Sequence, residues 1–167
     1  MELLVIRHAI AEEREVWART GRDDAERPLT AEGRKKMRLA AEGLQRIVHS
    51  VDVLASSPLV RAWQTAEIVA GAFGSTPIER VDALEPECSP EELLPWLRTH
   101  GEGERLAVVG HEPHLSGLVT WLLTGEMGHV IEFKKGAACL LALHGKPREG
   151  VATLLWALAP GQLRLIG

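Results

Sequence analysis

The sequence predicts a single α/β domain built on a largely parallel sheet. Short apolar runs of strand length alternate with longer segments in which apolar residues recur every three or four positions. The chain has 167 residues, the size of one domain with a full hydrophobic core, and no linker-like stretch divides it. We therefore expect one domain over 1–167.

Apolar runs predict the strands. Three of them predict buried strands: ELLVI at 2–6, VDVLAS at 51–56 and RLAVVG at 105–110. PIERV at 77–81 is a candidate for another strand. The runs AACLLAL at 137–143 and VATLLWAL at 151–158 are separated by HGKPREG. This arrangement predicts an antiparallel C-terminal hairpin at one side of the sheet.

Two helices are predicted on the N-terminal side of residue 75. The segment 30–50 carries one apolar stripe, and Thr30 is a suitable N-cap. The next helix is expected to begin with Ser57 as N-cap and Pro58 at the first helical position, where a backbone N–H would have no partner within the helix and its absence from proline costs nothing. Gly74 is placed to end that helix.

The remaining segments complete the pattern. SPEELLPWLRTHG at 89–101 predicts a capped helix that Pro95 disrupts locally, and EPHLSGLVTWLLTG at 112–125 predicts a longer one. The charged stretch from Arg7 to Pro28 predicts a long loop, with a helical turn near Val16 and Trp17. Loops of this length in compact domains are usually functional or disordered.

The composition of the chain limits which classes of partner we expect it to bind. A net charge of −4 and few aromatic residues argue against binding to nucleic acid or to an anionic membrane, and no apolar segment reaches the length of a membrane span. Two cysteines, Cys88 and Cys139, form no disulfide framework, and the N-terminal apolar run is too short for a signal peptide. We expect a cytoplasmic protein. Basic residues at 34–38 predict a solvated helix face, or alternatively contact with an acidic partner.

Basic and imidazole side chains follow three predicted strands. Arg7 and His8 follow the first, Arg61 lies in the first turn after the second, and His111 follows RLAVVG. Because parallel strands end at one edge of a sheet, we expect these four side chains to converge. Arginines match phosphate oxygens, a helix N-terminus favours an anion, and a neutral imidazole is a competent nucleophile toward phosphorus.

Such a site needs no metal ion, since arginines and imidazoles supply the charge. HEPH at 111–114 does not fit the zinc-binding helix motif, because its histidines are three residues apart rather than four and a proline lies between them. No serine lies in a nucleophile elbow, and no P-loop is present. We expect no metal and no cofactor.

Longer motifs carry a family resemblance. RHA at 7–9, SSPLVRAWQTAEIV at 56–69, VGHEPHLSGL at 109–118 and DAERPLTAEG at 24–33 resemble the histidine phosphatase superfamily, also called phosphoglycerate mutase-like. They are most similar to its small SixA-type phosphohistidine phosphatases. The resemblance spans roughly residues 1–123 and implies a three-layer α/β/α sandwich.

The resemblance also implies roles for individual residues. His8 would be the nucleophile that accepts the phosphoryl group, and Arg7, Arg61 and His111 would form the phosphate pocket. The family's usual tripeptide is RHG, and here Ala9 replaces the glycine. Many members use a carboxylate from the loop after the third strand as general acid, and Glu85 is the candidate by position. Glu12 and Glu13 are weaker candidates.

The short chain points to the substrate class. Little chain remains to close over the site as a lid, which favours phosphate displayed on a macromolecule, such as phosphohistidine on a phosphotransfer protein in signal transduction. A small-molecule phosphomonoesterase on the same scaffold is the alternative, and a non-catalytic module that binds phosphoproteins is another. The apolar tail after Trp156 leaves packing on the domain and packing on a neighbour both open.

Overall fold

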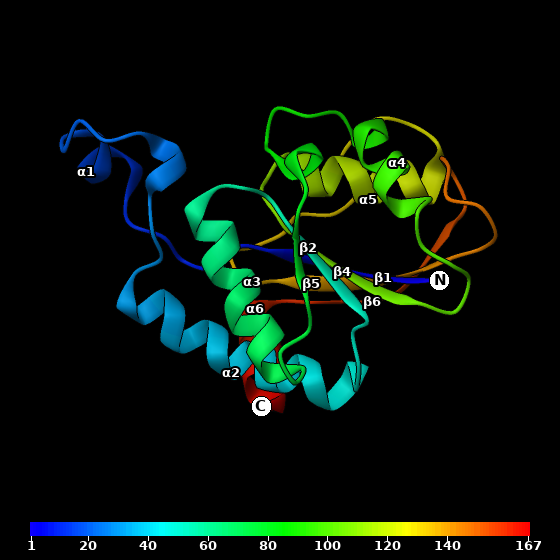
Figure 1. Cartoon of the computed structure of the whole chain (residues 1–167), viewed down its shortest axis with the longest axis horizontal. Helices are drawn as coiled ribbons and strands as arrows, with labels where there is room; N and C mark the ends of the chain where they lie inside the picture. The colour runs from blue at the N-terminus through cyan, green and yellow to red at the C-terminus, as the bar shows by residue number, and fades with distance from the viewer.

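The computed structural model describes residues 1–167 and contains one six-stranded sheet between two layers of helices (Figure 1). The strands lie in the order β3-β2-β4-β1-β5-β6. Their bounds are β1 Glu2–Arg7, β2 Val53–Ser56, β3 Ile78–Arg80, β4 Arg105–Gly110, β5 Ala138–Leu143 and β6 Ala152–Leu158. Strands β1 to β4 are parallel, whereas β5 is antiparallel to β1 and β6 is antiparallel to β5. The mostly parallel sheet and its C-terminal hairpin are confirmed.

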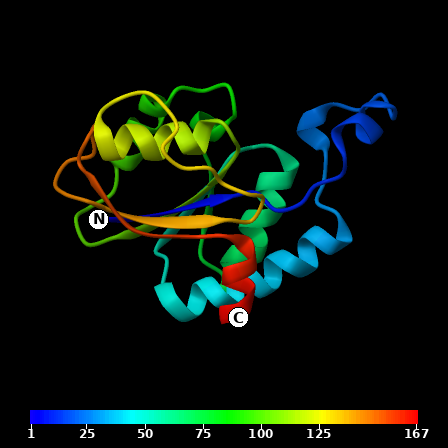
Figure 2. The ribbon, with the colours of Figure 1, turned by 180° about the vertical axis from the view of Figure 1, so that it is seen from behind.

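Strand β1 is apolar throughout because both of its faces are covered. Leu4 and Ile6 pack into a core with helices α2 (Ala31–Val48), α3 (Val60–Ala72) and α6 (Pro160–Ile166). Leu3 and Val5 face the opposite core, with α4 (Leu94–Leu97) and α5 (His114–Thr124). Figures 1 and 2 show these two helical layers on opposite faces of the sheet. The expected three-layer α/β/α sandwich is therefore the fold.

Two predicted helices differ in the structure. Helix α3 begins at Val60, not at Pro58, because Leu59 has an extended backbone with ψ of 133° and acts as the N-cap. The segment 89–101 forms a short 3-10 helix, Pro90–Leu93, followed by the single turn of α4. Pro95 lies in that turn and supplies no backbone N–H, so a continuous helix is not maintained. No helix is long and apolar enough to cross a membrane.

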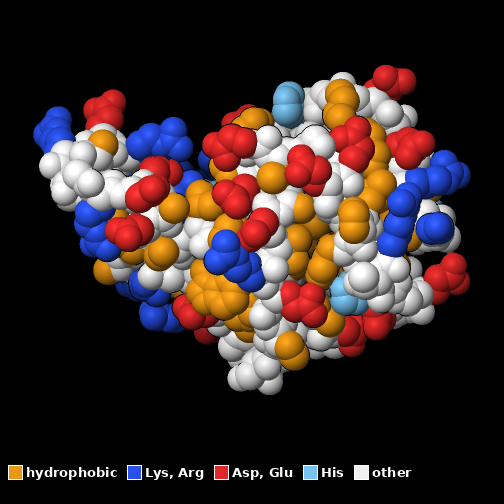
Figure 3. Space-filling model, turned by 45° about the horizontal axis from the view of Figure 1, so that its top comes forward, with side chains coloured by type: hydrophobic (Ala, Val, Ile, Leu, Met, Phe, Trp, Pro, Cys, Tyr) orange, Lys and Arg blue, Asp and Glu red, His pale blue; other side chains and the backbone are white.

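The predicted long loop projects from the sandwich. It contains the short helix α1 (Arg14–Ala18) and a 3-10 turn at Asp24–Glu26, and an isolated bridge between Ala11 and Leu29 closes its base. We call residues 11–29 the flap. In Figures 1 and 3 this segment extends beyond the body of the domain, and Figure 3 shows basic side chains on it, which are all arginines in this part of the sequence, together with acidic ones.

The C-terminal tail packs on its own domain. After β6 it forms α6, whose Leu163 is fully buried against α2. Gly43 permits this close approach, since a Cβ at that position would lie only 2.1 Å from the carbonyl oxygen of Leu163. Helix α2 and the tail are thus joined by a backbone contact that a larger residue at position 43 would prevent.

Candidate active site

The ends of β1 and β4 and the start of α3 meet at one cavity of about 220 Å³. Arg7, His8, Arg61 and His111 all line it. The parallel arrangement of β1, β2 and β4 explains this, because each strand delivers its next residues to the same edge of the sheet. The structure therefore brings together the four side chains that the sequence placed after three separate strands.

His8 is held with one ring nitrogen free. Its backbone N–H donates to the Gly110 carbonyl at 3.0 Å, and its Nδ1 lies 2.7 Å from the Ala9 carbonyl oxygen. A carbonyl oxygen can only accept, so Nδ1 carries the proton and Nε2 retains its lone pair. Burial lowers the pKa of His8 to about 3, against the hydrogen bond to Ala9, and the charges of Arg61 and Arg7 lower it further. The imidazole is neutral at pH 7 and suited to nucleophilic attack.

Ala9 fits its position without backbone strain. Its φ is not positive, so the conformation needs no glycine. The Ala9 N–H donates to Thr65 Oγ1 at 3.0 Å, and the Thr65 hydroxyl donates to the Arg61 carbonyl at 2.7 Å. This chain of hydrogen bonds ties the residue after His8 to the helix that carries Arg61.

His111 lies beside His8, with ring centroids 5.1 Å apart. Its Nε2 is 2.8 Å from Ser57 Oγ, while its buried Nδ1 has no partner in the protein. Burial lowers the pKa of His111 to about 2, and His8 and Arg61 add to the effect. The free Nδ1 is a buried polar atom that a ligand oxygen can satisfy.

In both predicted arginines, Nη1 is hydrogen-bonded to the protein and Nε is not. Arg7 Nη1 donates to the Phe133 carbonyl, and Arg61 Nη1 donates to the Asp24 carbonyl at 2.9 Å and lies 3.1 Å from its carboxylate. The Nε of each arginine is buried without a partner. Burial lowers the pKa of both guanidinium groups. Each guanidinium is thus anchored through Nη1 and keeps a buried Nε–H that has no partner in the protein.

The flap supplies another arginine, which is buried and which the sequence analysis missed. Arg27 is 6% exposed and lines the cavity; its Nε donates to Asp24 at 2.7 Å and its Nη1 donates to the Glu12 carbonyl at 2.7 Å. Asp24 therefore holds both Arg27 and Arg61. The segment DAERPLTAEG contained these two residues, yet neither periodicity nor residue type distinguishes a buried flap arginine from an exposed one.

The carboxylates that line the cavity do not include Glu85, the general-acid candidate from the sequence. Glu85 follows the 3-10 turn Asp82–Leu84 and is half-buried, but the cavity is lined by its neighbour Pro86. Glu12, Glu13 and Glu112 do line the cavity. A general-acid role for Glu85 stays a prediction. Throughout the chain, no three His, Cys, Asp or Glu side chains are grouped to hold a metal ion.

Comparison with known proteins defines the family. Residues 3–87 match the model of the histidine phosphatase superfamily, branch 1. An uncharacterized protein from Picosynechococcus sp. is 35% identical over 137 residues, which is 81% of each chain. The chain belongs to the histidine phosphatase superfamily. The matched region contains Arg7, His8 and Arg61, whereas His111 lies beyond it.

Solved structures place the chain among SixA-type members of the superfamily. The protein histidine phosphatase SixA complexed with tungstate is 26% identical, with a TM-score of 0.82 over 98% of this chain and 99% of that one. A SixA protein described as a phosphohistidine phosphatase from Agrobacterium tumefaciens has a TM-score of 0.75 at 23% identity, over 95% and 97% of the two chains. The fold is that of these phosphatases, and the chain spans their full length.

Proposed function

We propose that this histidine phosphatase removes phosphate from phosphohistidine on a phosphotransfer protein, without a metal ion, through a phosphorylated His8. The observation that carries the proposal is the lining of the catalytic cavity. None of its eleven residues is hydrophobic, and all except Pro86 are charged residues or histidines. Such a cavity can bind a phosphoryl group, but it offers no apolar wall to hold an aromatic or aliphatic body. The rest of the substrate must then be held outside, which suits a protein.

The reaction divides into two displacements. Nε2 of His8 forms a bond to phosphorus while the bond from phosphorus to the substrate imidazole breaks, and that imidazole leaves with a proton. Water then attacks phosphorus, the bond to His8 breaks, and inorganic phosphate is released. Arg7, Arg61 and Arg27 can donate to the equatorial oxygens, whose charge redistributes in the transition state.

The leaving group decides how much acid catalysis is needed. An imidazole can already carry the proton with which it leaves, so phosphohistidine needs little help from a protein acid. An oxygen ester does need a proton donor, for which Glu85 stays our candidate from the sequence. The SixA neighbour described in complex with tungstate, an oxyanion shaped like phosphate, supports an anion site in this fold.

The test is phosphate release from a histidine-phosphorylated phosphotransfer protein in the presence of EDTA. We expect turnover by the wild-type protein, loss of turnover in His8→Ala, and unchanged turnover in His144→Ala. His144 is exposed and follows Leu143, whose N–H donates to the Met1 carbonyl, at the opposite end of β1 from His8. A phosphoglycerate and an aryl phosphate serve as further substrates. His8-dependent release from these two alone would assign a small-molecule phosphomonoesterase, and binding of the phosphoprotein without any turnover would assign a binding module.

A further inference from the structure

A second cavity adjoins the catalytic one, and its polar lining is almost entirely cationic. Lys36 from α2, Lys135 from the loop before β5 and Arg164 from α6 line it. Lys135 also lines the catalytic cavity, so the two cavities share this side chain. The other lining residues are apolar or glycine: Ala9, Ile10, Gly33, Met37, Ala40, Gly136 and Pro160. Three elements far apart in sequence thus place positive charge beside the nucleophile.

Two of the three cations lack partners within the protein. Lys36 lies 3.2 Å from Glu32 on the preceding turn of its helix, but neither Lys135 nor Arg164 forms an ion pair with a carboxylate or a side-chain hydrogen bond. All three side chains belong to half-buried residues. Grouping half-buried like charges is unfavourable unless an anion compensates them. In a chain with a net charge of −4, this local excess of positive charge indicates a ligand.

Lys135 connects the second cavity to the chemistry. Burial is the main cause of the low pKa of His8, and the charge of Lys135 is among the causes that add to it. The Gly136 N–H, one residue later, points to the carbonyl oxygens of Arg7 and His8, at 3.2 and 3.1 Å. The loop that carries Lys135 is therefore fixed to the nucleophile, and an anion bound by Lys135 would lie next to the phosphoryl group.

The volume of the second cavity limits what can enter it. At about 20 Å³ it accommodates one small polar group and no complete metabolite. A carboxylate at the end of an Asp or Glu side chain fits this description, if the rest of its chain remains outside. Apolar walls around the cations reduce solvent screening and so strengthen the attraction.

We propose that Lys36, Lys135 and Arg164 form a subsite for an acidic side chain of the substrate protein, adjacent to its phosphohistidine. The subsite rests on the function proposed above and deepens it. It selects proteins that carry an Asp or Glu close to the phosphorylated histidine, because only then do the carboxylate and the phosphoryl group reach their two cavities together.

The experiment compares two phosphohistidine peptides of equal length. One carries glutamates on both sides of the phosphohistidine, and the other carries glutamines at those positions. We expect wild-type kcat/KM to favour the acidic peptide by about 3- to 20-fold, the range given by two partly exposed ion pairs. The double variant Lys36→Gln/Arg164→Gln should turn over both peptides at similar rates, and added salt should reduce the wild-type preference.

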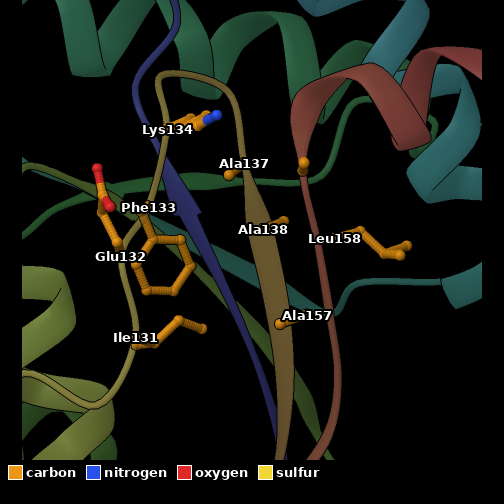
Figure 4. A pocket seen from close by; sticks show the side chains of 9 residues that line it. Ile131, Glu132, Phe133, Lys134, Ala137, Ala138, Ala157 and Leu158 are labelled. Atoms are coloured by element: carbon orange, nitrogen blue, oxygen red, sulfur yellow. The ribbon is translucent and has the colours of Figure 1, made fainter.

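Lys134→Gln is the matched control. Lys134 is adjacent to Lys135 in sequence, but its side chain lines a different, mainly apolar cavity beside β5 and β6 (Figure 4). It should retain the wild-type preference. Hydrolysis of an aryl phosphate by the double variant reports whether the catalytic cavity is intact, since that substrate has no second anionic group.

The outcomes separate the subsite from the proposed function. Equal wild-type rates on the two peptides would overturn the subsite while leaving the phosphohistidine activity in place. A preference that survives in the double variant, or that is lost equally in Lys134→Gln, would also overturn it. Turnover of the aryl phosphate with neither peptide attacked would refute the proposed substrate class, and the acidic occupant with it.

Discussion

Gly33 in the first turn of α2 packs against the backbone of Ile10, two residues after His8, the nucleophile that we propose. A Cβ at this position would lie 2.0 Å from the carbonyl oxygen of Ile10 and 2.9 Å from its carbonyl carbon. The same oxygen accepts the Thr30 N–H at 3.0 Å, which joins the start of α2 to the chain just after His8. Ordinary contact begins near 3.4 Å, so Gly33→Ala requires the two backbones to separate by about 1.4 Å.

The expected cost follows from that separation. Overpacking of this kind costs about 1–3 kcal/mol, and weakening the bond from Thr30 to Ile10 adds about 1 kcal/mol. We expect Gly33→Ala to lose about 2–4 kcal/mol of unfolding free energy. A displacement of about 1 Å near a reacting group can cost on the order of 100-fold in rate, so we expect kcat to fall about 10- to 100-fold.

The assays are urea unfolding and hydrolysis of an aryl phosphate, with Gly71→Ala as control. Gly71 lies in α3 with nothing within 4 Å of an added Cβ, so the control should keep its activity and gain up to about 1 kcal/mol from helix propensity. A Gly33→Ala protein whose unfolding midpoint and kcat both remain close to wild type would refute the reasoning.

Three further predictions concern the catalytic cavity. The folded-state pKa of His8 is about 3 and an unfolded histidine titrates near 6.5, so the unfolded state binds more protons at pH values between these two. Urea unfolding should therefore show a free energy of unfolding that falls as the pH is lowered from about 6.5 to about 3. Because His8 stays neutral in the folded protein, kcat/KM should show no inflection near pH 6.5. Arg61→Gln should weaken inhibition by tungstate about 10- to 100-fold, whereas the exposed Arg19→Gln should leave the inhibition constant unchanged. Ser57→Ala removes the partner of His111 Nε2 and should lower kcat about 3- to 10-fold in steady-state assays, with little change in KM.

The part of the site that lies at strand ends could be predicted from local sequence. Arg7 and His8 follow an apolar run that becomes β1, and His111 follows the run that becomes β4. Since parallel strands share one edge, a topological rule was enough to bring these residues together. Helical periodicity, which depends on local spacing alone, predicted most of the helices, whereas their arrangement in two layers was implied by the family resemblance.

The remaining cations depend on contacts that no local pattern encodes. Arg27 reaches the cavity because the bridge between Ala11 and Leu29 folds the flap back, and Lys135 reaches it because the Gly136 N–H faces the carbonyls at the end of β1. Both segments have irregular backbone, where side-chain direction has no fixed period. Ser57, in contrast, was singled out from the sequence but for a different role. Its type suggested the N-cap of α3, but the N-cap is Leu59; the Ser57 hydroxyl accepts the Leu59 N–H at 3.4 Å and lies 2.8 Å from His111 Nε2.

The carboxylate of Asp24 explains how several arginines can share one cavity before substrate binds. Asp24 accepts from Arg27 at 2.7 Å and lies 3.1 Å from Arg61 and 3.7 Å from Arg14. Burial opposes its ionisation, but the hydrogen bond from Arg27 and the three nearby positive charges lower its pKa, so it remains an anion. It contacts Arg61 through Nη1 and leaves the buried Nε unpartnered. Asp24 therefore leaves the Nε–H of Arg61 without a protein partner; in the function we propose, Asp24 orients this guanidinium, and the unpartnered N–H groups of Arg7 and Arg61 would donate to the phosphoryl oxygens.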